Sequence, residues 1–156
     1  MKSTLKIDTN VTMDVYKHGS LWYVEKKHNL VVTTGLNIVR DLLLNIGSPP
    51  NALAVGKGGT ATHSGMETLE SEVFRQAFTR KTSAVARVTY QYFLGTADGN
   101  VTAPDTLQEA GLFAGSGFNG VTPTIGGSLF ARTTFSPIAK DNTITIVFTW
   151  EVSPGV

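Results

Sequence analysis

Residues 143–152 constrain the fold of this chain more than any other stretch, because apolar side chains alternate strictly with mostly polar ones. Alternation with a period of two predicts a β-strand with one buried face and one solvated face. The apolar face carries Ile144, Ile146, Phe148, Trp150 and Val152. So much aliphatic and aromatic bulk on one strand requires a sheet beside it and a core beneath it.

The N-terminal segment shows the same alternation over residues 4–16, which predicts a second strand. His18-Gly19-Ser20 is a turn sequence, and residues 21–24 resume the apolar pattern, so we expect an N-terminal hairpin. The hairpin is expected to end at residues 26–29, before a short apolar run at 30–32. The alternating apolar residues of the first strand are Leu5, Ile7, Val11, Met13 and Val15.

The period then changes, and the spacing predicts a helix over residues 36–46. Thr34 is a suitable N-cap, Gly47 a suitable C-cap, and Pro49-Pro50 would stop the helix. The side chains expected to pack on the sheet are Leu36, Val39, Leu43 and Ile46. Because that packing would remove several large aliphatic groups from water, Leu43→Asp is expected to abolish folding.

Residues 66–77 leave two readings open, a second helix or an extended docking segment, because Leu69, Val73 and Ala77 are spaced by four. Residues 84–94 alternate and predict one long strand, and the glycine-rich stretch 95–127 is expected to be rich in loops, with those of 107–127 exposed at one end of the sheet. With 156 residues the chain fits a single domain over 1–156. The expected fold class is α+β, mostly β, with a sandwich-like antiparallel sheet.

The composition of the chain argues against several classes of function. The formal charge of +1 comes without a large basic cluster, so a nucleic-acid partner is not expected, and the longest apolar runs are far too short to span a membrane. Charged residues are only 16% of the chain, against about 25% in ordinary soluble domains. A surface poor in charge suits a protein that other chains cover.

No catalytic, cofactor or metal site is expected. Residues 56–60 form a glycine-rich stretch after a short strand, but the spacing of a phosphate-binding loop is absent, so we expect a tight turn whose glycines supply positive φ. His18, His28 and His63 are isolated in turn-like sequence and lack the paired spacing of metal ligands. The chain contains no cysteine, so a thiolate site is excluded and assembly in a reducing cytoplasm is the expected setting.

The order of several short motifs resembles the small β-rich structural proteins of tailed bacteriophages, including the N-terminal domain of tail-collar fibres and capsid decoration proteins. The resemblance is carried by residues 28–36, 53–56, 70–80, 109–113, 129–132 and 135–138, together with Trp150. It implies a virion component that is not an enzyme, assembled in the host cytoplasm. Because no fibrous shaft follows, it favours an oligomeric decoration or cement protein, a trimer, in contact with capsid subunits. A small tail, collar or baseplate protein is the alternative.

Four further expectations concern named residues. Glu109 and Arg132 are candidates for a partly buried ion pair, because both adjoin apolar side chains, and two separate surface charges are the alternative. Residues 1–16, with Leu5, Ile7, Val11 and Met13, are expected either to contact another subunit as an arm or to form an ordinary edge strand of the chain's own sheet. Trp22 and Tyr23 would form the platform of a carbohydrate-binding module, the third functional alternative. The large aromatic residues expected in the core are Phe113, Phe130, Phe135, Phe148 and Trp150.

Overall fold

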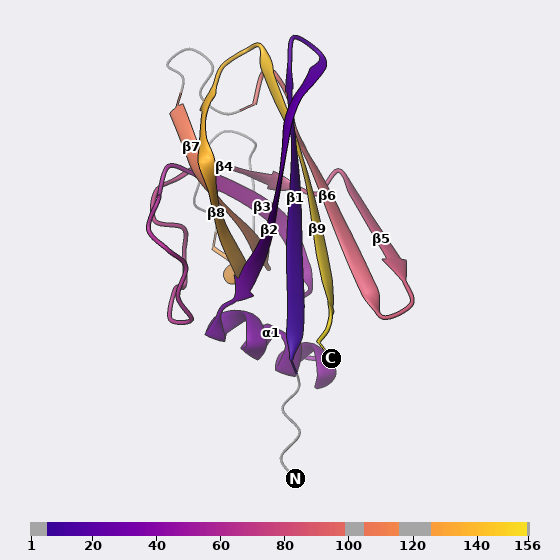
Figure 1. The fold of residues 1–156 in the computed structure, drawn as a ribbon. Coiled ribbons are helices and arrows are strands. Elements are labelled where there is room, and N and C mark those ends of the chain that lie inside the picture. The colour runs from indigo at the N-terminus through magenta and orange to yellow at the C-terminus, as the bar shows by residue number, and fades with distance from the viewer. Residues whose placement is uncertain (1–5, 99–104, 116–125, 156) are drawn as a thin grey trace.

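The computed structural model of the chain describes residues 6–98, 105–115 and 126–155. Within these ranges it has nine strands and one helix, and the strands form a single antiparallel sheet in the order β4-β3-β7-β8-β2-β1-β9-β6-β5 (Figure 1). The elements are β1 (Ile7–Lys17), β2 (Ser20–Val31), α1 (Thr33–Leu43), β3 (Pro50–Gly56), β4 (Glu72–Ala77), β5 (Arg80–Ala84), β6 (Arg87–Leu94), β7 (Asp105–Ala114), β8 (Ser128–Lys140) and β9 (Ile144–Pro154).

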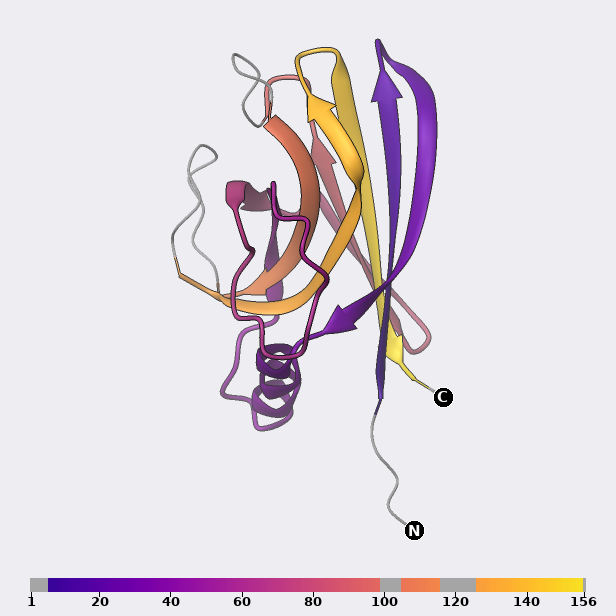
Figure 2. The same ribbon diagram turned by 60° about the vertical axis from the view of Figure 1, so that its left-hand side comes forward.

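The sheet curls so that its two halves enclose one main hydrophobic core (Figures 1 and 2). The halves meet at β2, which pairs with β1 along most of its length and with β8 only at Leu30 and Val31. Side chains from β1, β6 and β9 fill the core from one half, and side chains from β3, β7 and β8 fill it from the other. The structure therefore confirms the predicted α+β, mostly β fold, and its sandwich-like form comes from the curl of one sheet.

The C-terminal strand has the face that its sequence predicts. β9 lies between β1 and β6, and Ile144, Ile146, Phe148 and Trp150 are all buried. The aromatic residues assigned to the core are also buried, which confirms that prediction: Phe113, Phe130, Phe135, Phe148 and Trp150. Close packing of these large side chains is the main source of stability in such a fold.

The N-terminal hairpin is also confirmed, and it is tighter and longer than expected. Lys17 pairs with Ser20, so the loop contains only His18 and Gly19, with φ of 50° and 78°. Positive φ at both central residues defines a type I′ turn, whose twist matches that of the flanking strands. The third apolar run, residues 30–32, is not separate, because β2 continues to Val31.

The structure contradicts the expectation that the first strand is an arm that pairs with another subunit. β1 is hydrogen-bonded to β2 on one side and to β9 on the other, so neither of its edges is free for a neighbouring chain. Val11 and Met13 are buried in the main core, and Ile7 packs against it. The other reading of residues 1–16, an edge strand of the chain's own sheet, is right about the sheet but wrong about the edge, because β1 lies between β2 and β9. Leu5 lies outside the described residues.

The helix begins and ends three residues earlier than predicted, and it turns a different face to the sheet. Gly35 and Ile38 are its buried residues, whereas Leu36, Leu43 and Ile46 are exposed. The cause is a close approach to β8, since a Cβ on Gly35 would overlap the carbonyl oxygen of Phe130. This contact, and not the predicted apolar face, sets the rotation of α1 about its own axis. The expectation that Leu43→Asp abolishes folding is therefore wrong.

The predicted caps of the helix are wrong for the same reason. Val32 is the N-cap and makes no side-chain cap, while Thr34 lies inside the helix and its hydroxyl donates to the carbonyl of Leu129. At the other end the chain leaves the helix through Leu44, and Asn45 takes a φ of 58°. Gly47 closes the turn by donating its N–H to the Asp41 carbonyl at 3.2 Å.

Three other expectations differ from the structure. A helix over 66–77 is wrong, because β4 pairs there with β3. The strand expected over 84–94 is confirmed as β6 from Arg87 to Leu94 but begins three residues later, since Val85 and Ala86 form a turn between β5 and β6, with Ala86 at a φ of 56°. The stretch 95–127 is not all loop, because β7 pairs with both β3 and β8 and buries Leu107 and Leu112.

Candidate functional site: a buried ion pair under residues 57–71

Residues 57–71, which we call the covering segment, join β3 to β4 and lie over the outer face of β3, β7 and β8 (Figure 2). They carry Leu69 and Met66 onto a second, smaller apolar cluster on that face. A main-chain hydrogen bond from the Lys57 N–H to the Ser71 carbonyl joins the two ends of the segment, and one from the Thr33 N–H to the Ser64 carbonyl holds its middle, each at 2.8 Å. The other buried residues of the cluster are Val32, Ala54, Phe113 and Leu129.

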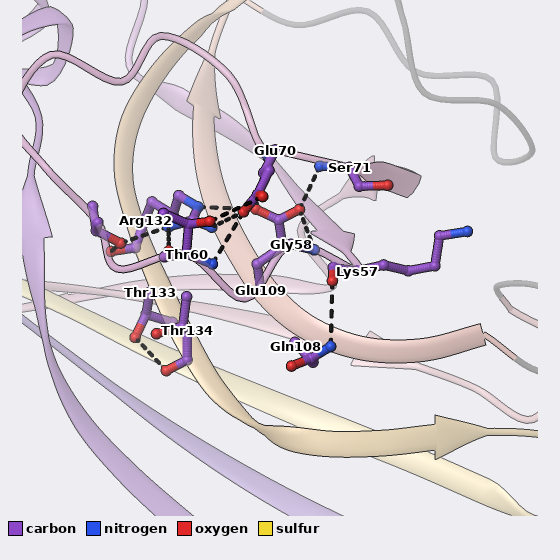
Figure 3. Close-up of polar contacts among 11 residues, drawn as sticks. Lys57, Gly58, Thr60, Glu70, Ser71, Gln108, Glu109, Arg132, Thr133 and Thr134 are labelled. Atoms are coloured by element: carbon purple, nitrogen blue, oxygen red, sulfur yellow. Dashed lines mark hydrogen bonds and ion pairs between the residues drawn. The ribbon is translucent and has the colours of Figure 1, made fainter.

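Glu109 points from β7 into the space beneath the covering segment, where its carboxylate is fully buried (Figure 3). Oε1 accepts the N–H of Gly58 at 2.9 Å and that of Ser71 at 2.7 Å, and Oε2 accepts the N–H of Glu70 at 3.0 Å. Oε2 also accepts Nε–H of Arg132 at 2.9 Å. The structure thus brings together Glu109 and Arg132, the pair that the sequence predicts, and adds three backbone donors.

Arg132 is fully buried as well and holds residues 60 and 62 of the covering segment. Its Nη1 donates to the Thr60 carbonyl at 2.7 Å and to the Thr62 hydroxyl at 3.0 Å. Its Nη2 lies 3.6 Å from Oε2 of Glu70, a charge contact beyond hydrogen-bond distance. The main-chain N–H and the hydroxyl of Thr60 lower the pKa of the Glu70 carboxyl, and the charge of Arg132 acts in the same direction.

The glycines of residues 56–60 permit close packing and do not have positive φ, so the expected tight turn with positive φ is wrong. A Cβ on Gly58 would lie 2.7 Å from Oε1 of Glu109, and one on Gly56 would overlap the same oxygen. The stretch does present an amide to an anion, as a phosphate-binding loop does, but the anion is the chain's own carboxylate. The space that a phosphate would need is therefore filled.

A second ion pair on the same face was not predicted. Arg75 donates to Glu72 through Nε and Nη2, each at 2.6 Å, and its guanidinium carbon lies 3.7 Å from the ring centre of Phe113. Residues three apart on a regular strand point to opposite faces. A β-bulge in β4 brings the two side chains to the same face, because Arg75 pairs with Ala54 while Glu72 pairs with Gly56, only two positions further along β3.

The two aromatic residues of the proposed glycan platform differ in exposure. Trp22 is 56% exposed and lies in the bulge of β2, with Nζ of Lys17 5.1 Å from its ring centre. Tyr23 packs against the main core, and burial, followed by the charge of Glu25, raises the pKa of its phenol. The rings meet edge to face at 5.4 Å, so Trp22 alone presents a broad ring face.

The outer side of α1 and the turn that follows it expose several large aliphatic side chains. Leu43 is 78% exposed and Leu44 is 61% exposed, while the only described ion pair on the helix joins Arg40 to Asp41 at 2.6 Å. A cavity of about 350 Å³ adjoins the helix, between Leu42, Pro50 and Tyr90. The large apolar side chains that α1 and the following turn expose are Leu36, Leu42, Leu43, Leu44 and Ile46.

Within residues 6–98, 105–115 and 126–155, no three His, Asp or Glu side chains gather as metal ligands do, and His18, His28 and His63 belong to no such group. No helix in the same ranges is long and apolar enough to cross a membrane. Neither a scan against protein-family models nor a search of the curated proteins gives a match to this sequence. The arrangement of Glu109 and Arg132 can clamp a loop to a sheet, and this is a structural role.

Proposed function

We propose that this chain is a non-enzymatic structural subunit of a bacteriophage particle, a homotrimer that associates through the outer face of α1. The observation that carries the proposal is the exposure of five large aliphatic side chains on α1 and the following turn. Burying one such side chain completely stabilises a complex by roughly 1.5–3 kcal/mol. Contiguous apolar patches of this kind mark interaction surfaces on soluble proteins.

A second copy of the same chain is the occupant that fits this face best. Arg40 and Asp41 neutralise each other on the helix, so two copies can approach without an unpaired charge between them. A closed cyclic trimer, in which the α1 faces of three copies meet around the symmetry axis, covers the patch on every copy. The clamped covering segment supports the proposal too, because a rigid domain loses little conformational entropy on association.

Capsid decoration is the position that we favour, with a tail, collar or baseplate position as the alternative. A cement subunit stabilises a shell by mass action, since its interfaces exist only in the assembled particle. The low share of charged residues, 16%, suits a surface that neighbouring subunits cover. The major capsid protein is then the expected partner, and the virion the expected location.

The self-association test uses two leucines of similar exposure at different ends of the molecule. Leu44 on α1 is 61% exposed, and Leu21 on the N-terminal hairpin is 57% exposed. By analytical ultracentrifugation, the unchanged chain is expected to sediment as a trimer, Leu44→Asp as a monomer with unchanged circular dichroism, and Leu21→Asp as a trimer. If the chain without substitutions stays monomeric at high concentration, the proposed trimer is contradicted.

Position in a particle requires a separate measurement. Electron microscopy of phage particles carrying the gold-labelled chain is expected to show hundreds of copies over the shell. A few copies at one vertex or on the tail would favour the alternative position. Absence of label from particles would reject the virion role.

A carbohydrate-binding module is the second candidate, and the exposed ring of Trp22 is the observation that favours it. An aromatic face in solvent can stack on the C–H groups of a sugar ring. Glycan-array binding that is lost in Trp22→Ala, with thermal unfolding unchanged, would promote this candidate. An array with no signal above background would remove it.

A further inference from the structure

The strand β5 forms one edge of the sheet and leaves one side of its backbone unpaired (Figure 1). Among the described residues it pairs with β6 and with no other strand, and all five of its residues are exposed. In an antiparallel pair every second residue of an edge strand directs its N–H and C=O groups away from its partner. Such an edge can accept one more strand from another chain.

The apolar cavity next to α1 opens on the inner side of this edge. Lys81 pairs with Tyr90, which is buried in the main core, and Ser83 pairs with Val88, which packs against the same core. Cross-strand partners point to the same face of a sheet, so Lys81 and Ser83 belong to the inner face. The cavity of about 350 Å³ lies between these four residues and Leu42 of α1. Its volume is several times the roughly 30 Å³ that one water molecule occupies in the liquid, so an aliphatic side chain of an added strand fits.

The two cations at the start of β5 are uncompensated. Neither Arg80 nor Lys81 forms an ion pair with a described residue, whereas Arg87 on β6 lies 3.2 Å from Glu151. The residues opposite the two cations on β6 are a glutamine and a tyrosine. Like charges directly opposite each other destabilise a strand pair, and opposite charges stabilise it. The edge therefore favours a strand that carries carboxylates, and its positive charge opposes pairing with a basic strand.

We propose that β5 binds an extended acidic segment of another protein, which adds to the sheet as one more antiparallel strand. Two consecutive carboxylates of the segment lie opposite Lys81 and Arg80, on the inner and the outer face in turn. An aliphatic side chain opposite Ser83 is on the inner face, where it enters the cavity. Main-chain hydrogen bonds supply the affinity, and these three side chains fix the register. The partner sequence therefore reads, from its N-terminal end, aliphatic, any residue, acidic, acidic.

This surface does not depend on self-association through the outer side of α1. Leu44, the residue whose substitution tests the trimer, does not line the cavity beside β5. Leu44→Asp is therefore expected to bind the acidic segment as the unchanged chain does. Failure of the trimer and failure of the β5 site are then separate results.

The test uses a fluorescein-labelled peptide, Thr-Val-Thr-Ile-Thr-Glu-Glu-Thr, and measures binding by fluorescence anisotropy. The unchanged chain is expected to bind it with a Kd on the order of 0.1 mM. Two altered peptides should bind at least tenfold more weakly: one with lysine in place of both glutamates, and one with N-methyl groups on alternate backbone nitrogens. The second keeps the side chains and charges but cannot pair with an edge strand.

Charge reversal on the protein gives the complementary measurement. The double variant Arg80→Glu with Lys81→Glu should bind the acidic peptide at least tenfold more weakly and should bind the lysine peptide instead. The matched control is Lys17→Glu with Lys26→Glu, which makes the same change in net charge at two exposed cations of the N-terminal hairpin. This control should leave the Kd of the acidic peptide within about twofold.

Amide hydrogen exchange followed by NMR locates the bound peptide. Binding is expected to slow exchange at alternate residues of β5 and to leave β4, the other edge strand, unchanged. The proposal is overturned if the acidic peptide does not bind, or if the slowed amides lie outside β5. It is equally overturned if the N-methylated peptide binds as tightly as the unmodified one, because the attraction is then one of charge alone.

Discussion

Nε of Arg132 and Oε2 of Glu109 lie 2.9 Å apart with both side chains fully buried, on adjacent strands of the sheet. The same two side chains also bind main-chain groups at Gly58, Thr60 and Ser71. One ion pair therefore fastens a long irregular segment at several points. Removing the charge of Arg132 leaves Glu109 buried without a cation, and removing that of Glu109 leaves Arg132 with only the more distant, partly exposed carboxylate of Glu70 at 3.6 Å.

Glu109→Gln is expected to lower the free energy of unfolding by about 3–5 kcal/mol, because it removes the buried carboxylate that pairs with Arg132 and leaves only the partly exposed Glu70 at 3.6 Å near the guanidinium. Urea unfolding followed by circular dichroism measures the change. Glu25→Gln, at a pair whose lysine is exposed, should cost no more than about 1 kcal/mol. A loss below 1 kcal/mol for Glu109→Gln would show that the pair does not hold the segment.

Gly58→Ala is expected to destabilise the protein by about 1–3 kcal/mol, because the new methyl group would lie 2.7 Å from Oε1 of Glu109. Gly59→Ala is the matched control, since the nearest atom to its new Cβ is the flexible Oε1 of Gln108 at 3.1 Å. Thermal unfolding of the two variants should differ by several degrees. Equal melting temperatures would mean that the covering segment moves away at little cost.

Tyr92→Phe is expected to stabilise the protein by about 1 kcal/mol at pH 8, because the buried hydroxyl has no hydrogen-bond partner among the described residues. Burial, followed by the charge of Asp98, raises the pKa of the Tyr92 phenol. The stability that the neutral phenol supports is present below the unfolded pKa of about 10 and is lost as pH rises above it.

The advantage of Tyr92→Phe should therefore grow between pH 10 and pH 11, by up to about 1.4 kcal/mol. Urea unfolding of both proteins at pH 8, 10 and 11 gives the difference, in which ionisation of the other groups cancels. Tyr16→Phe, at a partly exposed position on β1, controls for the loss of a hydroxyl. A difference that does not change with pH would show that Tyr92 ionises as easily in the folded protein as in the unfolded chain.

Leu43→Asp is expected to leave the free energy of unfolding of the dissociated chain within about 0.5 kcal/mol, because this side chain is 78% exposed. Ile38→Asp, on the buried face of the same helix, should prevent folding by placing a charge against β8. Circular dichroism and urea unfolding at low protein concentration separate the two outcomes. Loss of folded structure in Leu43→Asp would show that Leu43 packs in the core after all.

Local patterns predicted the parts of the fold that depend on near neighbours. The period of two on β9 and the His18-Gly19 turn of the first hairpin involve residues close in sequence, so both were predictable. The rotation of α1 was not, because it depends on the contact of Gly35 with Phe130, 95 positions away. The spacing of Leu69, Val73 and Ala77 imitates a helix, but Leu69 covers the outer cluster while Val73 and Ala77 belong to β4.

The candidate site was predictable only in part. The apolar neighbours of Glu109 and Arg132 indicated a buried pair, and the structure contains it. The three amides that also bind Glu109 come from residues 58, 70 and 71, and no local pattern connects them to a strand that begins at Asp105. The pair between Glu72 and Arg75 depends on a bulge, and bulges leave little trace in composition.

The central position of β9 has a consequence for biosynthesis. β9 separates β1 from β6, so β1, the first described strand to be synthesised, has no neighbour on one side until the last described strand has emerged. During translation the nascent chain must keep the inner face of β1, with Val11, Met13 and Val15, out of contact with other chains. Premature termination before Ile144 would leave two long unpaired edges, so truncated products should be cleared by proteolysis or should aggregate.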